Sequence, residues 1–481
     1  MKVLQACAEF FPLLKTGGLA DVCAALPRAL GRCGFDVRVL MPAFPALRAG
    51  LADAAPIETA FALPGGVEVL RGTLPEGSTG YLVDAPMYAH GKNPYVDATG
   101  RPHADSHLRF ALLGRVAALL AEGLDASWQP QLVHGHDWHA GLAPVYLRAA
   151  SQRLRRRVAG SVLTIHNLAF QGTFPMAVRA ELDLPAAYFG IEGLEFYEQI
   201  SFMKGGLVHA DKLTTVSPTY AREIQGAEQG CGLDGVLRAR AADLSGILNG
   251  VDPEIWNPAT DPLIAMRYDA TRLPRKATCR ERLQAELGLD ARADAPLFGV
   301  VSRLTEQKGI HLVLEGLAEM VRRGAQLAVL GSGDAALEAA LREAAAAAPA
   351  QVALRLGYDE ELAHRIVAGA DVILVPSRFE PCGLTQLYGL RYGTLPLVRR
   401  VGGLADSVAD CTLENLDDGT ATGFVFDRLE LADYLAAVRR AFALHARRGD
   451  WRKVQAQAMA QRFDWDTAAQ QYAAVYGSIA S

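Results

Sequence analysis

The sequence predicts an α/β protein with two doubly wound, Rossmann-like domains. Short apolar runs alternate with helical patterns along 481 residues, which is typical of parallel sheets covered by helices. The chain is too long for one compact core and most naturally forms two. The pentapeptide Gly-Gly-Leu-Ala-Asp occurs at 17–21 and again at 402–406. Because it lies each time between an apolar run and a helical pattern, each half of the chain has its own glycine turn.

In the first half, the apolar runs and helical patterns alternate regularly apart from one region. Strands are expected at residues 2–9, 36–41, 80–85, 131–136, 161–166 and 212–217, and helices at 18–32, 106–123, 139–150 and 217–225. Residues 42–104 interrupt the alternation and are rich in glycine and proline. They predict a long irregular insertion, which is either a functional rim or a plain surface loop.

The second half begins after a hinge expected near residues 244–252, where several prolines follow. A helix is expected at 276–287, strands at 297–302, 326–330, 351–356, 371–376 and 395–399, and final helices at 430–445, 451–462 and 465–478. No strong strand separates the final helices, so the last is expected to leave the second sheet. We therefore divide the chain into domains at 1–245 and 246–460 and a terminal segment at 461–481.

Composition excludes several classes of function. The net charge of −5 and a pI near 6.2 give no overall attraction to nucleic acid or to an anionic membrane. Seven scattered cysteines without a Cys-x-x-Cys pair indicate reduced thiols, with neither a disulfide framework nor a zinc site. There is no leader-like segment and no apolar run of about 18 residues. We expect a cytoplasmic protein without nucleic-acid or membrane partners.

The stretch Lys15–Val22 follows a strand-like run and begins a helical pattern. Its two glycines allow a ligand to come close to the backbone, and the N–H groups of the first helical turn lack partners within the helix. With the charge of Lys15, the stretch suits an anion. The alternative is a tight turn beside a solvated lysine.

Arg303 ends an expected strand, and Lys308 follows five residues later before a helix. Open α/β sheets bind ligands at the carboxyl ends of their strands, where two cations suit a diphosphate. An ordinary loop with salt bridges is the alternative.

A second motif, Glu380-Pro-Cys-Gly-Leu-Thr385, also follows a strand and begins a helix. A phosphate at Gly383–Thr385 and a sugar hydroxyl on Glu380 fit this arrangement, although Glu380 could also be an ordinary carboxylate at a helix N-terminus. Cys382 lacks an accompanying histidine motif and is interpreted as a packing residue and not as a nucleophile.

Gly331-Ser-Gly333 follows a strand and nearly fits a dinucleotide fingerprint. The acidic residue expected about 20 positions later is missing. We therefore interpret the motif as a turn that faces a nucleotide and not as an NAD site.

Three histidines and an aspartate lie within residues 134–139 and resemble a metal cluster. Strand alternation places His134 and His136 on one face, the following helix turns His139 away, and no acidic partner segment is evident. We therefore favour a sugar-binding edge, with Asp137 and Trp138 as polar and stacking contacts, and expect no metal.

His166 and Asn167 end another expected strand and enter an aromatic loop. From position alone, His166 is either a catalytic or binding group or a neutral, hydrogen-bonded residue.

Taken together, these stretches resemble the glycogen and starch synthase family, whose members are GT-B glycosyltransferases. The resemblance covers nearly the whole chain and is most specific at Lys15–Val22, His134–Gly141, Thr164–Asn167, Ser302–Gly309 and Ser377–Gln386. It implies two Rossmann-like domains facing across a cleft, with the C-terminal helix returning to the first domain. It also implies transfer of glucose from ADP-glucose to the non-reducing 4-OH end of an α-1,4-glucan such as glycogen, with retention, release of ADP, and neither metal nor cofactor.

The resemblance also implies roles for individual residues. The catalytic residues are His166 beside the reacting centre, Arg303 and Lys308 on the diphosphate, and Glu380 on the donor glucose. The implied binding residues are Lys15, Gly18, Cys382, Gly383, Leu384 and Thr385 around the phosphates, Asp137, Asn167 and Asn249 in the sugar subsite, Tyr358 at the adenine, and Tyr95 and Trp138 on the acceptor side.

One position departs from the wider group of retaining GT-B enzymes. Many of these have a second glutamate eight positions after the first, where this chain has Tyr388, which leaves open what holds the ribose. Two other functions remain possible: a retaining GT-B transferase that uses a UDP-sugar, and a non-catalytic glucan-binding protein on the same fold.

Overall fold

The structure is a computed structural model that describes residues 1–59, 61, 63, 65–89, 93–97 and 99–480. Part of the expected insertion, including residues 90–92, therefore lies outside the described residues. The chain forms two compact units, unit 1 (Met1–Gly250 with Trp465–Ser481) and unit 2 (Val251–Asp464). The domain boundaries expected after residues 245 and 460 lie a few residues before these crossings.

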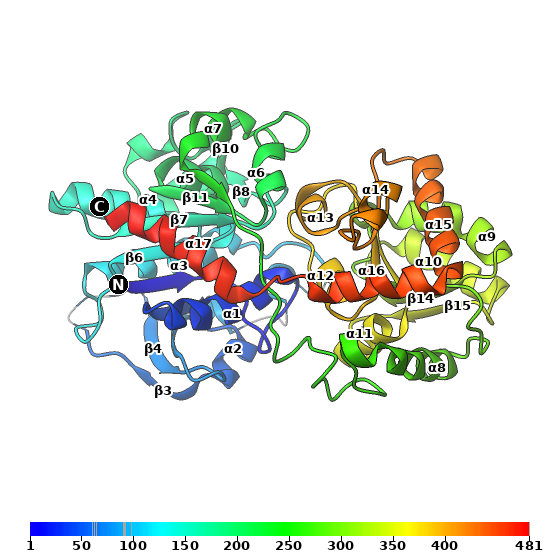
Figure 1. Cartoon of the computed structure of the whole chain (residues 1–481). Coiled ribbons are helices and arrows are strands. Elements are labelled where there is room, and N and C mark those ends of the chain that lie inside the picture. Colours follow the sequence, from blue (N-terminus) through cyan, green and yellow to red (C-terminus); the bar gives the residue numbers. More distant parts are fainter. Residues whose placement is uncertain (60, 62, 64, 90–92, 98, 481) are drawn as a thin grey trace. The chain divides into compact units, whose positions relative to one another are not determined.

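Unit 1 is built on a nine-stranded sheet in the order β12-β11-β7-β6-β1-β2-β5-β4-β3 (Figure 1). Its parallel strands are β1 (Lys2–Ala6), β2 (Asp36–Pro42), β5 (Thr79–Asp84), β6 (Leu132–His136), β7 (Gly160–Ile165), β11 (Lys212–Thr215) and β12 (Leu244–Gly246). The predicted parallel sheet is thus confirmed over six expected strands, and β12 falls in the expected hinge.

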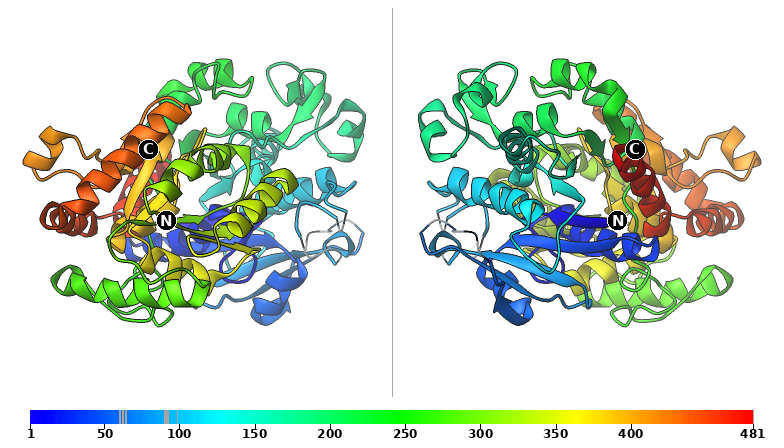
Figure 2. Two further views of the ribbon diagram at one scale, coloured as in Figure 1. Left: turned by 90° about the vertical axis from the view of Figure 1, so that its right-hand side faces the viewer. Right: turned by 90° about the vertical axis from the view of Figure 1, so that its left-hand side faces the viewer.

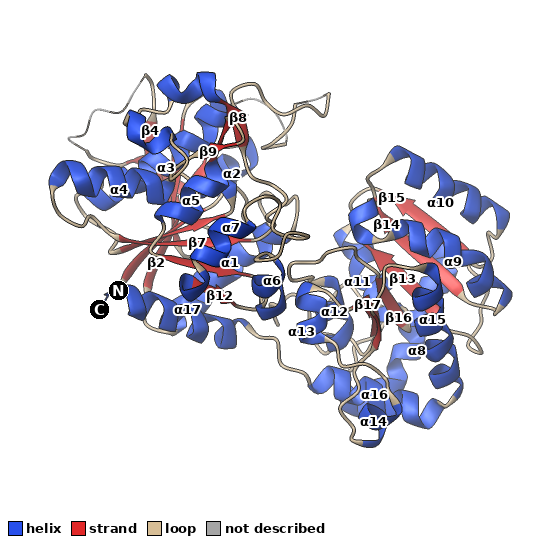
Figure 3. Cartoon of the chain, turned by 90° about the horizontal axis from the view of Figure 1, so that it is seen from above, coloured by secondary structure: helices blue, strands red, loops and turns tan. Residues whose placement is uncertain are grey.

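Helices cover both faces of this sheet (Figure 3). The helices of unit 1 are α1 (Gly18–Arg32), α2 (Pro45–Gly50), α3 (Ser106–Glu122), α4 (Ala143–Leu154), α5 (Phe202–His209), α6 (Pro218–Glu223), α7 (Asp234–Ala239) and α17 (Trp465–Ala480). Val3 and Leu132 pack in a core with residues of α1 and α17. Their neighbours Leu4 and Val133 pack in a second core with residues of α3 and α4. Because side chains alternate along a strand, the two helix pairs lie on opposite faces.

The region expected to be irregular contains further structure. The strands β3 (Ala52–Pro56) and β4 (Glu68–Thr73) extend the main sheet in antiparallel fashion. Later in the chain and outside this region, β8 (Thr173–Pro175), β9 (Glu195–Phe196) and β10 (Gln199–Ser201) form a small second sheet. The expectation of a long irregular insertion at 42–104, with a strand only at 80–85, was wrong over α2, β3 and β4.

Unit 2 contains a six-stranded parallel sheet in the order β15-β14-β13-β16-β17-β18. Its strands are β13 (Leu297–Val301), β14 (Gln326–Gly331), β15 (Val352–Leu356), β16 (Val372–Val375), β17 (Leu395–Arg399) and β18 (Phe424–Phe426). Its helices are α8 (Lys276–Leu287), α9 (Ile310–Arg322), α10 (Ala335–Ala347), α11 (Glu360–Gly369), α12 (Thr385–Arg391), α13 (Gly402–Ser407), α14 (Leu413–Asp417), α15 (Leu431–Ala446) and α16 (Arg448–Ala460). The five expected strands are confirmed, and β18 was missed.

The last helix, α17, belongs to unit 1, as the predicted return of the chain requires. Both ends of the chain lie on the same side of that unit (Figure 2), where Met1 and Ile479 line one cavity. The first and last residues of unit 2 lie side by side. The N–H of Val251, where the chain enters the unit, donates to the carbonyl of Phe463, next to the point where it leaves, at 2.7 Å. No helix in the described part of the chain is long and apolar enough to cross a membrane.

Candidate active site

The strand order of each sheet identifies the edge at which a ligand is expected. In unit 2 the order reverses at β13, which pairs with β14 on one side and β16 on the other. In unit 1 it reverses at β1, which pairs with β2 and β6. Ligands of open α/β sheets bind beyond the carboxyl ends of the strands at such reversal points. Most of the predicted site residues follow these strands.

Lys308 and Glu380 form an ion pair beyond the carboxyl ends of β13 and β16. Lys308 Nζ donates to Glu380 Oε2 at 2.6 Å, and the two side chains are 18% and 7% exposed. The hydroxyl of Ser377 donates to the same oxygen at 2.9 Å. Both of these hydrogen bonds end on Oε2. None of the described residues hydrogen-bonds to Oε1 of Glu380, so Oε1 can accept a hydrogen bond from a ligand hydroxyl.

Arg303 lies at the same edge and is exposed. Its guanidinium donates to the side-chain oxygen of Gln307 at 3.1 Å, and it has no acidic partner within the described part of the chain. Because this cation is not neutralised, it can bind an anion beside the Lys308–Glu380 pair.

The second Gly-Gly turn holds the backbone of Glu380 in place. The N–H of Gly403 donates to the carbonyl of Glu380 at 3.1 Å. A Cβ added at Gly402 would lie 1.9 Å from that carbonyl oxygen, and one added at Gly403 would lie 2.1 Å from the oxygen of Cys382. Only glycine allows this approach at both positions. The sequence identified the repeat but not this contact.

The turn Cys382–Thr385 is anchored from both sides. Cys382 is buried, in agreement with its interpretation as a packing residue, and Leu384 packs against the core of unit 2. The hydroxyl of Thr385 donates to the carbonyl of Val301 at 3.3 Å, which ties α12 to β13. The side-chain amide of Gln386 donates to the carbonyls of residues 382 and 383 at 3.0 and 2.8 Å. These contacts fix the turn beside Glu380.

The glycines at 331 and 333 have a local structural role. Added Cβ atoms would lie 1.9 Å from the carbonyl oxygen of Ser302 and 2.4 Å from that of Leu304. The N–H of Leu304 donates to the carbonyl of residue 332 at 2.9 Å. Close packing of the chain after β14 against the chain after β13 therefore explains both glycines without a nucleotide.

Two tyrosines of unit 2 differ in their surroundings. Tyr358 is 70% exposed, and its hydroxyl donates to Glu360. Tyr388, at the position of the missing glutamate, is buried and stacks on Trp256 with ring centroids 3.8 Å apart. His364 stacks on Trp256 at 3.7 Å. Tyr388 thus completes an aromatic stack with Trp256 and His364.

In unit 1, the first Gly-Gly turn is organised by Glu9, which the sequence analysis missed. The Glu9 carboxylate accepts hydrogen bonds from the N–H and the hydroxyl of Thr16, both at 2.6 Å, and from the Tyr95 hydroxyl at 2.5 Å. Lys15 Nζ is 3.1 Å from Asp21 Oδ1. Gly18 is exposed at the first position of α1, so its N–H is one of those without a partner within the helix.

Asp137 connects β6 with the end of β7. Its Oδ1 accepts the N–H groups of His166 at 2.7 Å and Asn167 at 3.3 Å. Burial raises the pKa of Asp137 to about 7, although these two hydrogen bonds act in the opposite direction. The predicted sugar-subsite residues Asp137 and Asn167 are therefore in contact, and Asp137 also fixes the backbone at His166.

Two of the histidines that resembled a metal cluster, His134 and His136, instead bond to neighbouring side chains. His134 bonds through Nδ1 to the hydroxyl of Tyr476 at 2.7 Å and through Nε2 to that of Thr164 at 2.6 Å. His136 Nδ1 lies 3.0 Å from His166 Nε2. Burial lowers the pKa of His134 and His166 to about 3 and lowers the pKa of His136. Among the described residues, no group of three His, Cys, Asp or Glu side chains could hold a metal.

Tyr95 and Trp138 belong to an aromatic cluster around His139. Tyr95 stacks on His139 at 4.7 Å, and Trp138 packs at 4.3 Å from the same ring. Gly172, with a φ of +59°, brings the loop after β7 against Trp138, where an added Cβ would lie 2.1 Å from the indole. Asn249 is also buried, and its Oδ1 has no hydrogen-bond partner in the described part of the chain.

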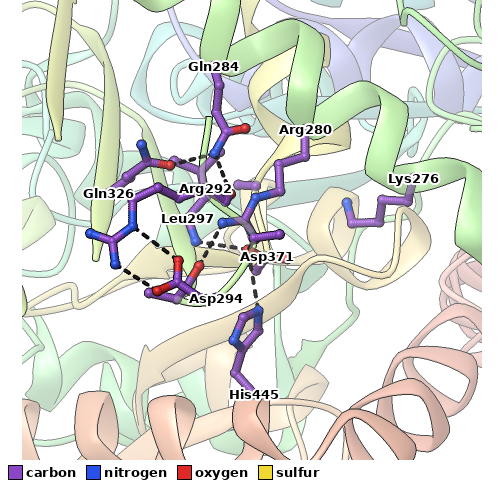
Figure 4. A network of polar contacts seen from close by, with 12 residues as sticks. Lys276, Arg280, Gln284, Arg292, Asp294, Leu297, Gln326, Asp371 and His445 are labelled. Carbon is purple, nitrogen blue, oxygen red and sulfur yellow. Dashed lines mark hydrogen bonds and ion pairs between the residues drawn. The ribbon is translucent and has the colours of Figure 1, made fainter. Parts of the chain in front are cut away.

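A network of polar and charged side chains in unit 2 gathers around Asp371 and Arg280 (Figure 4). Asp371 precedes β16, where its carboxylate accepts the N–H of Leu297 at 2.8 Å and a hydrogen bond from Arg280. Lys276 donates to the carbonyl of Ala368 and the hydroxyl of Thr394, both at 2.6 Å, and burial lowers its pKa to about 8. These groups gather at the amino ends of β13, β16 and β17 and join α8 to the sheet.

The predicted residues therefore fall into two groups, one in each unit. In unit 2 the structure brings together Lys308, Glu380 and the turn at 382–385, with Arg303 exposed at the same edge and Tyr358 on the surface. Unit 1 contains Lys15, Gly18, Tyr95, Asp137, Trp138, His166, Asn167 and Asn249. Glu9 and Ser377, which were missed, are ordinary acidic and hydroxyl residues near the ends of strands. Their proximity to the motifs is the one signal that could have found them.

Family models match both units. The starch synthase catalytic domain matches residues 2–239, and the glycosyl transferases group 1 family matches residues 286–456. Glycogen synthases from Leptothrix cholodnii and Francisella philomiragia are 58% and 54% identical to this chain. Each alignment covers 100% of this chain and 100% of the relative. That of Variovorax paradoxus is 58% identical over 99% of this chain and 98% of its own.

Solved structures agree with these matches. The catalytic domain of starch synthase IV from Arabidopsis thaliana, bound to ADP and acarbose, superposes with a TM-score of 0.90 at 30% identity over 100% of this chain and 99% of its own. Sucrose-phosphate synthase from Thermosynechococcus elongatus shares the fold, with a TM-score of 0.61 at 18% identity over all of both chains. The chain belongs to the glycogen and starch synthase family of GT-B glycosyltransferases.

Proposed function

We propose that the protein transfers glucose from ADP-glucose to the non-reducing 4-OH end of an α-1,4-glucan, with retention of configuration and release of ADP. The observation that carries this proposal is the set of groups beyond β13 and β16: a cation without an acidic partner at Arg303, and the Lys308–Glu380 pair with one open carboxylate oxygen. The solved relative bound to ADP and acarbose supports a nucleotide and a glucan as ligands.

The chemistry follows from charge. As the bond between C1 of glucose and the phosphate oxygen breaks, the sugar gains positive character and the diphosphate gains negative charge. Arg303 and Lys308 stabilise that charge, with Lys15, Gly18 and the turn at Cys382–Thr385 as further donors. The departing phosphate oxygen accepts the proton of the attacking 4-OH, and the new bond forms on the face that the phosphate leaves.

The sugar is held by the remaining predicted residues. Glu380 accepts a glucose hydroxyl through Oε1, and His166 lies beside the reacting carbon. Asp137, Asn167 and Asn249 line the sugar subsite; the buried, unpaired Oδ1 of Asn249 supports a polar ligand there. Tyr358 contacts the adenine, and Tyr95 and Trp138 lie on the acceptor side. The reaction uses neither a metal nor a cofactor.

A labelled-sugar assay tests the donor, the acceptor and the metal together. The protein is incubated with glycogen and labelled ADP-glucose or UDP-glucose, with and without EDTA. We expect incorporation from ADP-glucose in both conditions. Transfer from UDP-glucose alone would replace the proposed donor, loss of activity with EDTA would reject the metal-free reaction, and no transfer from either would leave a glucan-binding protein.

The stereochemistry is tested on the labelled product. β-Amylase removes α-1,4-linked units from non-reducing ends, so it should release the incorporated label as maltose. Label that resists the enzyme would contradict an α-1,4 product. Lys15→Ala should lower turnover strongly without unfolding the protein, and an unchanged rate would remove Lys15 from the site.

A further inference from the structure

His136 is a buried histidine with no role in the proposed reaction. It ends β6, is 0% exposed, and packs between two other imidazoles, with ring centroids 4.3 Å from His134 and 5.2 Å from His166. Its Nδ1 lies 3.0 Å from Nε2 of His166, and its own Nε2 has no hydrogen-bond partner among the described residues. Among the described residues, the side chain of His136 thus has its polar contact with His166.

That contact constrains both rings. Because burial lowers the pKa of His136 and of His166, both imidazoles are neutral at pH 7. A neutral imidazole has one N–H, so one ring must donate to the other across the 3.0 Å contact. The choice of donor fixes the tautomer of His166 and therefore whether its Nδ1 carries a proton.

His136 is itself supported from the C-terminal helix. His134 packs against it and is held at both nitrogens, by Tyr476 at 2.7 Å and by Thr164 at 2.6 Å. Tyr476 lies on α17 and is 0% exposed. The rings of His134, His136 and His166, which we call the imidazole stack, therefore extend from α17 to the carboxyl end of β7.

We propose that His136 is a positioning residue for His166, and that Tyr476 holds the same imidazole stack from α17 through His134. The proposal rests on the proposed function, since it takes His166 to lie beside the reacting carbon. It assigns the last helix of the chain a part in the active site of unit 1 without any contact with substrate.

The first test reads the tautomer directly. Long-range ¹H–¹⁵N spectra of ¹⁵N-histidine-labelled protein distinguish the two neutral tautomers from a rapidly exchanging mixture, and a His166→Gln variant identifies the signals of His166. We expect one fixed tautomer in the unmodified protein and an averaged mixture in His136→Leu. His136→Asn should keep a fixed tautomer, because the asparagine amide lies near the position of Nδ1.

The second test separates turnover from binding. His136→Leu should lower kcat about tenfold, the size of one lost hydrogen bond, with the KM for the nucleotide sugar changed much less. His136→Asn should recover most of that loss. Tyr476→Phe removes one hydroxyl and should lower kcat several-fold and shift the His166 signals. Ile479→Ala, which reduces packing of α17 without touching the imidazole stack, should leave those signals in place.

The outcomes are distinct. An averaged His166 in the unmodified protein, or a fixed tautomer that survives in His136→Leu, would overturn the role of His136. If His136→Leu fails to fold, His136→Asn still tests the proposal. An averaged tautomer of His166 in His136→Asn would also overturn the role of His136. Unchanged His166 signals in Tyr476→Phe would overturn the role of α17. A protein that transfers no sugar would refute the proposed function alone, since the spectra need no turnover.

Discussion

At the scale of single residues, the Lys308–Glu380 pair links stability to activity. Both side chains are largely buried, so removal of one partner leaves a charge with little water around it. We expect Lys308→Met and Glu380→Gln each to lower the free energy of unfolding by about 2 kcal/mol, and the double variant to lose less than the sum. Urea-induced unfolding of the three variants measures this.

The same variants should lose activity for a different reason. Loss of a preorganised charge at the departing diphosphate, or of the carboxylate on the sugar, should lower kcat about 100-fold or more in all three. Arg342→Gln provides a control, because the Arg342 side chain is 57% exposed and pairs with Glu338 within α10. Full activity in Glu380→Gln would exclude this carboxylate from the site.

The two Gly-Gly turns make a second residue-scale prediction. A Cβ at Gly403 would collide with the backbone of Cys382, whereas one at Gly17 would meet nothing within 4 Å. Gly403→Ala should therefore destabilise the protein by about 2 kcal/mol or more, and Gly17→Ala by less than about 1 kcal/mol. Thermal unfolding of the two variants compares them, and equal losses would contradict the assignment of different roles to the repeats.

At the scale of elements, α17 covers the face of unit 1 that α1 also covers. Trp465 and Tyr472 are buried in a core with Leu26 and Leu30 of α1. A chain ending at Asp464 should expose this apolar surface and bind the dye ANS strongly. A chain ending at Ile479 keeps the buried residues of α17 and serves as the control. Weak dye binding by the shorter chain would mean that α17 is dispensable for this core.

How well each element could be predicted depends on the signal it leaves in the sequence. Helix α1 has the predicted bounds because its apolar face and glycine start are both visible. All residues of β3 are exposed, so it lacks an alternating pattern, and β18 has only three residues. Both pair with a neighbouring strand at a sheet edge, and such pairing is a tertiary contact that no local pattern encodes.

The residues of the candidate site likewise differ in how far the sequence could predict them. Position after a strand was sufficient to select Lys308 and Glu380, because parallel strands bring their carboxyl ends together. It could not reveal that Glu9 holds the first glycine turn, or that Gly402 is required by the carbonyl of Glu380. These contacts depend on pairs of segments whose approach is set by packing of the whole unit.

At the scale of the whole molecule, buried titratable groups make the two units respond differently to acid. Burial lowers the pKa of five histidines in unit 1: His134, His136, His139, His166 and His209. Below about pH 6.5 the unfolded chain binds protons at these residues and the folded chain does not, so stability falls as the pH falls. Asp137, with a pKa raised to about 7, acts in the opposite sense.

From pH 7.5 to 5.5, each of these five histidines should cost about 1.4 kcal/mol and protonation of Asp137 should restore about 2 kcal/mol, a net loss of about 5 kcal/mol for unit 1. Unit 2 has His445, with a pKa lowered to about 4, and should lose less. Hydrogen exchange read by mass spectrometry at both pH values assigns the loss to each unit. His139→Phe should reduce it in unit 1, and equal losses in both units would contradict this account.

The chain crosses between the units twice, after Gly250 and after Asp464. Unit 2 is therefore a continuous segment inserted into unit 1, and the first unit to leave the ribosome is the last to be complete. Unit 2 can fold as soon as it emerges, whereas unit 1 must wait until α17 is made, with the face of its sheet that α1 and α17 share only partly covered. During synthesis the uncovered part of that face is accessible to chaperones and to other nascent chains. If the segment of α17 stood at the start of the chain, this period of exposure would be avoided.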